Sequence, residues 1–507
     1  MKDKSLTKSI TFNDFKKEIL NDYKTIVISR ETSLLGRKEV LSGKAKFGIF
    51  GDGKELPQIA MAKAFRRGDH RSGYYRDQTF MLALNEISVQ QIFSGLYANT
   101  DLQKEPMSGG RQMGSHFMSN YLNEKGDFID STQKYNSSSD ISPTSGQMPR
   151  LLGLAMASKL YREGSFNSKN FSNNGNEVAW GTIGNASTSE GPFFEVFNAA
   201  GVHQVPMIIS VWDDEYGISV NNSYQTTKSS ISKALHGFKR DKSNKGFEIY
   251  TVDGWDYQSL IQIYEHSSNS CRENHIPILI HVKNLTQPIG HSTSGSHERY
   301  KNKSRLDWEM KNDCNRKMRE WILDNNLSDL SEIEQIEKDC LEFVRSEKKT
   351  AWDDFQKDII VERDSFIKLI KSLVHQYKSK DLAEIANSLL RLKDLGRKDV
   401  MSAARRALRL ENGSDFFEKI NKWVSDYKKN VQPLYSSHLY NESKNNYKSV
   451  IPVPAEYDED SKMVDGRLIL RDNFDYLMSK EPNLIFFGED TGKIGDVNQG
   501  LEGLQKK

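Results

Sequence analysis

Cysteine is scarce in this sequence of 507 residues, which contains only Cys271, Cys314 and Cys340. Their spacing matches neither a metal-ligand motif nor a disulfide framework, so we expect a reducing compartment. Long apolar runs are missing as well, because no stretch approaches the roughly 18 apolar residues that a membrane span needs. The sequence therefore predicts a cytoplasmic protein without membrane segments.

A charge excess of one sign is also absent. Lys and Arg number 71 against 69 Asp and Glu, so no basic excess is available to neutralise a nucleic-acid backbone. The N-terminal segment "MKDKSLTKSITFNDFKKEIL" lacks the apolar core of a secretory signal, and it contains acidic residues but no arginine, which disfavours a mitochondrial presequence. We expect neither nucleic acid nor a membrane among the partners.

Residues 1–305 alternate helical patterns with short β-branched runs. Four runs are the clearest predicted strands: Glu177–Ile183, Val205–Trp212, Phe247–Val252 and Ile276–Val282. Their apolar residues barely alternate, which is typical of a parallel sheet covered by helices on both faces. The expected fold class is therefore α/β.

The composition changes after residue 305. Residues 306–430 are highly charged, with apolar residues at three- and four-residue spacing, which predicts a helical region. Residues 431–460 contain little periodicity and three prolines, and we expect an extended linker there. Residues 461–507 begin another α/β unit, with a helix around Leu468 and Leu477 and a strand at Leu484–Phe487. Because a new domain needs far more chain to bury its core, we expect a C-terminally truncated sequence.

A loop of small residues joins a predicted strand to a predicted helix in "VAWGTIGNASTSEGPFFEVFNAAG", residues 178–201. Gly184 ends the strand, and Pro192 marks the start of the helix. Exposed N–H groups and the helix dipole at such a junction favour an anion. An ordinary strand-to-helix turn is the alternative for this segment alone.

Acidic residues follow the next predicted strand. Val205–Trp212 runs directly into Asp213–Glu215, and in an open parallel sheet both turns would face the crevice at the carboxyl ends of the strands. The side-chain oxygens of Asn185 and Asp214, with a backbone carbonyl, could hold Mg²⁺ there, while phosphate and water complete its shell.

These two segments resemble the diphosphate-binding signature of thiamine diphosphate enzymes, Gly-Asp-Gly followed further along the chain by Asn. In that family the Asp and Asn side chains ligate the metal together with a nearby backbone carbonyl. The resemblance gives these roles to Asn185, Asp214 and Tyr216, with the amide and the carboxylate exchanged. Three neighbours of Asn185 are also expected to contact the cofactor: Gly184, Ala186 and Ser187.

A wider resemblance is to the decarboxylating dehydrogenase component of 2-oxo acid dehydrogenase complexes, above all the branched-chain type. "SGYYRDQ" resembles the family's Tyr-Arg segment, which places Tyr75 and Arg76 on the cofactor diphosphate with Tyr74 adjacent. Arg suits this role because its guanidinium is permanently charged and bidentate toward phosphate. A surface ion pair between Arg76 and Asp77 is the alternative.

"GGRQMGSHF" resembles the branched-chain Gly-Arg-Gln-Met segment, with Gly114 in place of proline.

Two further segments extend the resemblance. "ISPTSGQMP" matches the segment whose backbone, at Ser142 and Thr144, meets the aminopyrimidine ring, and Gly146 in place of threonine argues against a monovalent-cation site nearby. "QPIGHSTSGSHERYK" matches the Gly-His-Ser loop over the reactive ring, which makes His291 the expected catalytic histidine and leaves His297 structural. A histidine of ordinary pKa titrates near neutrality and can move protons.

The C-terminal "FFGEDTGKIGD" resembles the start of the β-type chain of the same enzymes, where a glutamate hydrogen-bonds the pyrimidine nitrogen. Glu489 has that position, and a solvated turn is the alternative. The resemblance thus implies an α-type diphosphate-binding domain in residues 1–305, fused to the opening of a β-type domain in residues 461–507. Glu489 would reach a cofactor held by another chain, which implies a homo-oligomer, a dimer or larger.

The implied activity is oxidative decarboxylation of a 2-oxo acid with thiamine diphosphate and Mg²⁺, followed by acyl transfer to a lipoyl group of a partner acyltransferase. Branched-chain acids such as 3-methyl-2-oxobutanoate are the first expectation, and pyruvate is the second. The other possibilities are a transketolase-type reaction, a metal-independent nucleotide site, and a truncated chain that binds cofactor without turnover.

Overall fold

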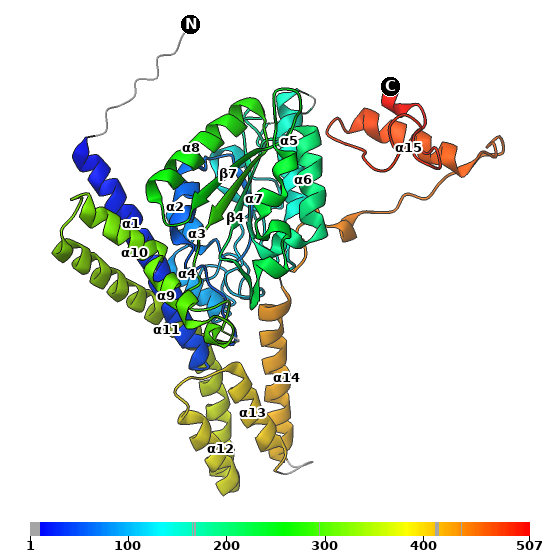
Figure 1. The fold of residues 1–507 in the computed structure, drawn as a ribbon. Coiled ribbons are helices and arrows are strands. Elements are labelled where there is room, and N and C mark those ends of the chain that lie inside the picture. The colour runs from blue at the N-terminus through cyan, green and yellow to red at the C-terminus, as the bar shows by residue number, and fades with distance from the viewer. Residues whose placement is uncertain (1–10, 165, 167–168, 294, 411–414, 438) are drawn as a thin grey trace.

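The computed structural model describes residues 11–507 except 165, 167–168, 294, 411–414 and 438 (Figure 1). Its centre is a parallel sheet of six strands in the order β2-β1-β3-β4-β8-β7. The strands are β1 (His70–Ser72), β2 (Asn136–Ser137), β3 (Ala179–Gly184), β4 (Met207–Trp212), β7 (Glu248–Asp253) and β8 (Ile278–Lys283). A small antiparallel ribbon of β5 (Tyr216–Gly217) and β6 (Val220–Asn221) follows β4.

The α/β prediction and the four predicted strands are confirmed. Strands β3, β4 and β8 are almost completely buried, which explains why their apolar residues do not alternate. In the register of β3 and β4, Gly184 lies opposite Trp212. Because both strands run in the same direction, the turns that follow them leave the same edge of the sheet.

Helices cover both faces of the sheet (Figure 1). One face packs on α1 (Phe12–Leu41), α2 (Glu55–Ala64) and α8 (Tyr257–Asn274), in an apolar cluster that includes Trp180 and Ile208. The other face packs on α5 (Met148–Arg162) and α6 (Gly191–His203), with Ile183 and Ile209 in the cluster. Shorter helices on the connections are α3 (Gln78–Ala83), α4 (Val89–Leu96) and α7 (Ile231–Ala234).

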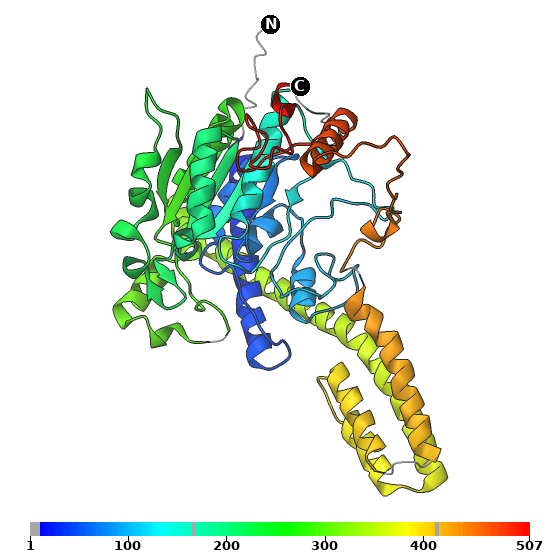
Figure 2. The same ribbon diagram turned by 90° about the vertical axis from the view of Figure 1, so that its right-hand side faces the viewer.

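A helical arm follows the sheet domain. It comprises α9 (Lys303–Lys311), α10 (Cys314–Asp324), α11 (Leu330–Tyr377), α12 (Lys380–Leu390), α13 (Arg397–Leu408) and α14 (Asp415–Ser436). The first half of α11 packs on α1 and α4, while its second half forms a separate apolar cluster with α12, α13 and α14. This second part extends away from the sheet in both views (Figures 1 and 2). Helix α14 continues to Ser436 with Pro433 inside it, so the extended segment predicted from residue 431 begins later than expected.

The C-terminal segment contains the predicted helix, α15 (Gly466–Lys480), but the strand predicted at Leu484–Phe487 is wrong. A strand needs a neighbour to satisfy its backbone N–H and C=O groups, and no strand of the described residues pairs with this segment. Within the described residues, its aromatic packing consists of Phe486 against Phe474, with ring centroids 4.9 Å apart. Within the described residues, no helix combines the length and the apolar character that a bilayer crossing requires.

Candidate active site

A cavity of about 460 Å³ lies at the carboxyl ends of β3 and β4. Its lining comes from the turn before α2, the turn after β1, the segment before α5, the loop after β3, the acidic turn after β4 with the residues that follow it, and the loop after β8. The predicted site residues that this cavity brings together are Tyr74, Tyr75, Arg76, Thr144, Gly184, Asn185, Ala186, Ser187, Asp214, Tyr216 and His291. The fold therefore gathers segments that are more than two hundred residues apart in the sequence.

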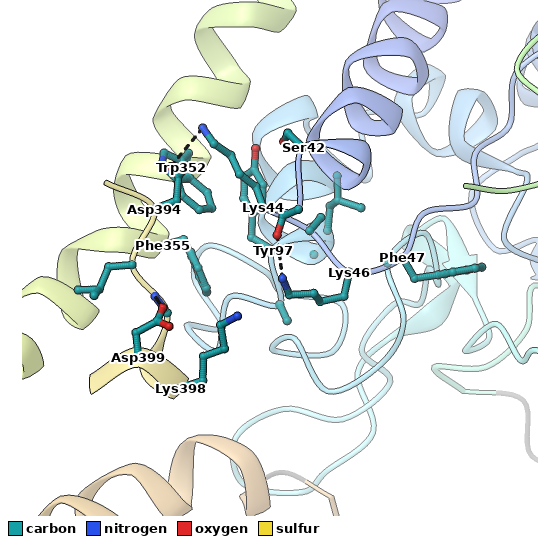
Figure 3. A pocket seen from close by; sticks show the side chains of 18 of the residues that line it. Ser42, Lys44, Lys46, Phe47, Tyr97, Trp352, Phe355, Asp394, Lys398 and Asp399 are labelled. Carbon is teal, nitrogen blue, oxygen red and sulfur yellow. Dashed lines mark hydrogen bonds and ion pairs between the residues drawn. The ribbon is translucent and has the colours of Figure 1, made fainter. Parts of the chain in front are cut away.

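Two other cavities are larger, but different residues line them. One of about 520 Å³ lies where the loop after α1 meets the helical arm (Figure 3). There Lys44 Nζ lies 4.7 Å from the ring centroid of Trp352 and 3.6 Å from Asp394 Oδ1. The other, of about 710 Å³, lies between α1, α2 and α8. Neither is lined by a predicted site residue, so chemistry and not volume identifies the candidate site.

The loop after β3 continues into a short 3₁₀ turn before α6 begins at Gly191, with Pro192 in its first turn. The predicted helix start is thus confirmed. The backbone N–H of Asn185 donates to the carbonyl of Trp212, which fixes the loop against β4. Asn185 is 5% exposed, and its Nδ2 has no hydrogen-bond partner among the described residues. A buried amide without a partner at a cavity wall is a group that a polar ligand can satisfy.

Arg76 is 4% exposed, and its guanidinium donates to two carbonyls, Phe50 at 2.6 Å and His291 at 3.0 Å. The alternative of a surface ion pair with Asp77 is wrong, because Asp77 pairs with Arg71 at 2.7 Å and both side chains are fully buried. None of the described carboxylates lies within ion-pairing distance of Arg76. A buried cation without a counter-ion at the cavity wall favours an anionic ligand.

Asp214 follows β4 and is 8% exposed. Its Oδ2 accepts a hydrogen bond from Lys54 Nζ at 2.9 Å, and its Oδ1 accepts one from the backbone N–H of Tyr216 at 3.2 Å. Burial acts to raise the pKa of Asp214, but the positive charges of Lys54 and Lys301 outweigh it and lower the pKa below its ordinary value. The carboxylate is therefore ionised and fully engaged with protein groups.

Lys54 is a buried, charged residue of the site that the sequence did not predict. It is 1% exposed, and its ammonium also donates to the carbonyl of Thr286 at 2.9 Å and to Gln287 Oε1 at 2.7 Å. The preceding Gly53 has φ +80°, and a Cβ there would lie 2.1 Å from the Thr286 oxygen, so only glycine permits this close approach. Burial lowers the pKa of Lys54, while Asp214 acts in the opposite direction. The signal in the sequence was "GDGKELPQ", a lysine between a glycine turn and an apolar helix.

The three residues predicted to ligate Mg²⁺ do not fit that ion as they stand. Asp214 is the only carboxylate of the set, and both of its oxygens already accept hydrogen bonds, one of them from an ammonium. Asn185 and the Tyr216 carbonyl contribute no charge. The Mg²⁺ site predicted here is therefore not supported by the geometry.

His291 lies at the cavity wall in the loop after β8, and Arg76 holds its backbone carbonyl. Thr293 fixes the same loop, since its N–H donates to the Gly48 carbonyl and its hydroxyl accepts from the Gly48 N–H, both at 3.0 Å. Burial and the nearby charges of Arg76 and Lys54 lower the pKa of His291 to about 3. The expectation that it titrates near neutrality is wrong, and the imidazole is neutral at pH 7. Ser294 lies outside the described residues.

Two predicted residues do not line the cavity. Ser142 Oγ lies 2.9 Å from Nε2 of His116, whose ring centroid is 6.0 Å from that of Tyr75, so Ser142 belongs to a neighbouring layer. Glu489 is exposed in the C-terminal segment. The structure thus brings the diphosphate side of the predicted site together, while Glu489 stays outside it.

Comparisons with known proteins match the segments that form this cavity. A family model described as the dehydrogenase E1 component matches residues 23–359. The 2-oxoisovalerate dehydrogenase subunit alpha of Bacillus subtilis (strain 168) is 27% identical over 301 residues, which cover 58% of this chain and 79% of that protein.

Two further relatives match less of their own length. The mitochondrial 2-oxoisovalerate dehydrogenase subunit alpha 2 of Arabidopsis thaliana is 26% identical over 315 residues, 61% of this chain and 58% of that protein. The pyruvate dehydrogenase E1 component subunit alpha of Rickettsia bellii (strain RML369-C) is 24% identical over 199 residues, 39% of this chain and 55% of that protein. The chain thus spans little more than half the length of these two relatives.

Proposed function

The chain belongs to the dehydrogenase E1 component family, and from this premise we propose that it is the α-type part of a thiamine diphosphate-dependent 2-oxo acid dehydrogenase. The family membership confirms the family that the sequence motifs predicted. The single observation that carries the proposal is the buried guanidinium of Arg76, which has no carboxylate partner among the described residues, beside the unpartnered amide of Asn185 in one cavity. Together they favour a phosphate-bearing ligand at the carboxyl ends of the strands.

The residues of the cavity are proposed to hold the cofactor by its diphosphate. Arg76 would bind the phosphate oxygens, with Tyr75 beside it, and the loop after β3 would add backbone N–H groups. Ser142 and Thr144 are proposed to meet the aminopyrimidine ring through their backbone. When bound, thiamine diphosphate supplies the electron sink that allows a 2-oxo acid to lose carbon dioxide.

His291 is proposed to act on the reacting atoms. Its imidazole is neutral at pH 7, so one ring nitrogen can accept a proton while the other donates a hydrogen bond. The Arg76 and Gly48 contacts hold its loop in place at the cavity wall. We propose that this neutral histidine stabilises the carbonyl oxygen of the substrate and assists acyl transfer.

The substrate and the partners follow from the same premise. The relatives include 2-oxoisovalerate and pyruvate dehydrogenase subunits, so a branched-chain 2-oxo acid such as 3-methyl-2-oxobutanoate is the first proposal and pyruvate is the second. A lipoylated acyltransferase is the proposed acyl acceptor. Because Glu489 lies outside the cavity of its own chain, a homo-oligomer in which it reaches a second chain is proposed.

Reduction of an artificial electron acceptor tests the proposal. The full-length chain is supplied with thiamine diphosphate and either 3-methyl-2-oxobutanoate or pyruvate, with Mg²⁺ present. Acceptor reduction that depends on both the 2-oxo acid and the cofactor is expected. Cofactor binding without reduction would instead indicate a chain that binds without turnover. Thermal stabilisation by NAD but not by thiamine diphosphate would indicate a nucleotide site and contradict the proposal.

A further inference from the structure

We infer that the ammonium of Lys54 takes the place of a divalent cation beside the diphosphate site, so that this chain binds its cofactor without requiring Mg²⁺. The inference rests on the proposed function, because it concerns the diphosphate of the same cofactor. It follows from what Lys54 contacts, and it assigns a role to a residue that the sequence motifs did not single out.

Lys54 Nζ contacts three oxygens of three different kinds. They are the carboxylate of Asp214 at 2.9 Å, the backbone carbonyl of Thr286 at 2.9 Å and the side-chain carbonyl of Gln287 at 2.7 Å. Carboxylate and carbonyl oxygens are the ligands that hard divalent cations take in proteins. Since an ammonium has three N–H donors, all of its hydrogen bonds are used, and it acts on a diphosphate through its charge.

The position of Lys54 is fixed by the fold. The residue is fully surrounded at the start of α2, and the positive φ of Gly53 lets this turn approach the Thr286 carbonyl. A lysine on the surface would lose side-chain entropy on pairing and contribute little, whereas this ammonium is held by three acceptors inside the protein. Lys54 is therefore held at a fixed position at the cavity wall, paired with Asp214.

The positive charges around Asp214 disfavour the binding of a second cation. Asp214 is neutralised by Lys54, and Asn185, which stands at the other predicted ligand position, is uncharged. A divalent ion at Asp214 would add two positive charges next to the ammonium of Lys54 and near the guanidinium of Arg76. Like charges in a buried site repel strongly, because little water screens them.

The remaining groups of the cavity are sufficient to bind a diphosphate. Arg76 supplies a positive charge with no carboxylate partner among the described residues, and the buried Nδ2 of Asn185 supplies a donor that lacks a partner there. The loop that leads into the thirteen-residue helix α6 lines the same cavity at Ala186 and Ser187. These groups bind phosphate oxygens directly, without a bridging metal.

The test is a calorimetric titration of the full chain with thiamine diphosphate, once in EDTA and once in excess Mg²⁺, with inorganic diphosphate as a second probe. We expect the two dissociation constants of each probe to agree within about threefold. A dissociation constant that Mg²⁺ lowers by about tenfold or more would overturn the inference and leave the proposed function intact. Absence of thiamine diphosphate binding in both solutions would instead overturn the proposed function.

Variants of Lys54 sharpen the test. Lys54→Gln removes the ammonium and frees Asp214, so Mg²⁺ is expected to tighten thiamine diphosphate binding by about tenfold or more. Lys54→Arg retains the charge and should stay independent of Mg²⁺. The matched control is Lys348→Gln, which removes a lysine that pairs with Glu39 at 2.9 Å outside the cavity. A folded Lys54→Gln protein that remains independent of Mg²⁺ would contradict the role of Lys54, and the wild-type titration decides the question if this variant does not fold.

Discussion

Lys54 Nζ lies 2.9 Å from Asp214 Oδ2, although 160 residues separate the two in the sequence. Lys54 directly precedes α2 and Asp214 follows β4, so the ion pair connects the start of a helix on one face to the edge of the sheet where the cavity opens. Both residues are buried, and removal of one partner leaves an uncompensated charge inside the protein. A substitution of either residue in the site is therefore expected to change the stability of the fold.

The first prediction concerns this pair. Asp214→Asn is expected to lower the free energy of unfolding by about 3–5 kcal/mol, because Lys54 loses its counter-ion while it remains buried. The double variant Lys54→Gln/Asp214→Asn removes both charges and should recover a large part of that loss. Urea denaturation of the two single variants and the double variant measures the coupling. Additive losses, with no recovery in the double variant, would contradict a direct interaction.

The second prediction concerns Arg76. Arg76→Lys keeps a positive charge but loses the planar fork, so the dissociation constant of thiamine diphosphate should rise by about 10- to 100-fold. Calorimetry measures this change. The control is Arg319→Lys on α10, in a partly exposed ion pair with Glu337 of α11, which should leave the dissociation constant unchanged. Equal affinity of the wild type and Arg76→Lys would mean that Arg76 does not bind the diphosphate.

The third prediction concerns His291. His291→Ala should lower the rate of lipoyl acylation by about 10²–10⁴-fold if the imidazole acts in proton transfer. The dissociation constant of thiamine diphosphate should change by no more than about threefold, because the backbone carbonyl of residue 291 still accepts from Arg76. Acylation of a lipoylated acyltransferase domain in a single turnover is the measurement. A rate near that of the wild type would exclude His291 from the chemistry.

The fourth prediction concerns pH. Burial lowers the pKa values of His70 and His275 to about 4 and that of His291 to about 3, from an ordinary value of 6.5. Above pH 6.5 these histidines are neutral in both the folded and the unfolded chain. As the pH falls from 6.5 toward 4, the unfolded chain binds protons that the folded chain does not. The free energy of unfolding should therefore fall by up to about 1.4 kcal/mol per pH unit for each histidine.

Urea denaturation at several pH values checks this slope. His275→Gln should reduce the slope by the contribution of one proton, whereas substitution of the exposed His203 by Gln serves as the control. An unfolding free energy that stays constant between pH 6.5 and pH 4 would contradict the burial of neutral histidines in the folded chain.

The central strands were predictable because both of their faces are buried. All six residues of β4 are buried, and the sequence shows the nearly continuous apolar run that such a strand requires. β1 and β2 were not predicted, since they contain only three and two residues and no apolar run. Pairing with β3 makes β1 a strand, and a single sequence does not display such tertiary contacts. The strand expected at Leu484–Phe487 has the right composition but no partner strand among the described residues.

The site residues also divide into those that the sequence predicts and those that it does not. Asn185 and Asp214 were predictable because the turns after parallel strands meet at one edge of the sheet. The segment "GDGKELPQ" marks Lys54 only weakly, because its acceptors Thr286 and Gln287 lie 232 and 233 residues away. The lowered pKa of His291 depends on burial and on neighbouring charges, which only the folded chain defines.

Calorimetric titration of the chain with thiamine diphosphate, with Arg76→Gln alongside, tests most directly whether the cavity after β3 and β4 is the cofactor site. We expect saturable binding to the wild type and binding at least about tenfold weaker in Arg76→Gln. Absence of binding to the wild type, or equal affinity in the two proteins, would contradict the assignment of this cavity.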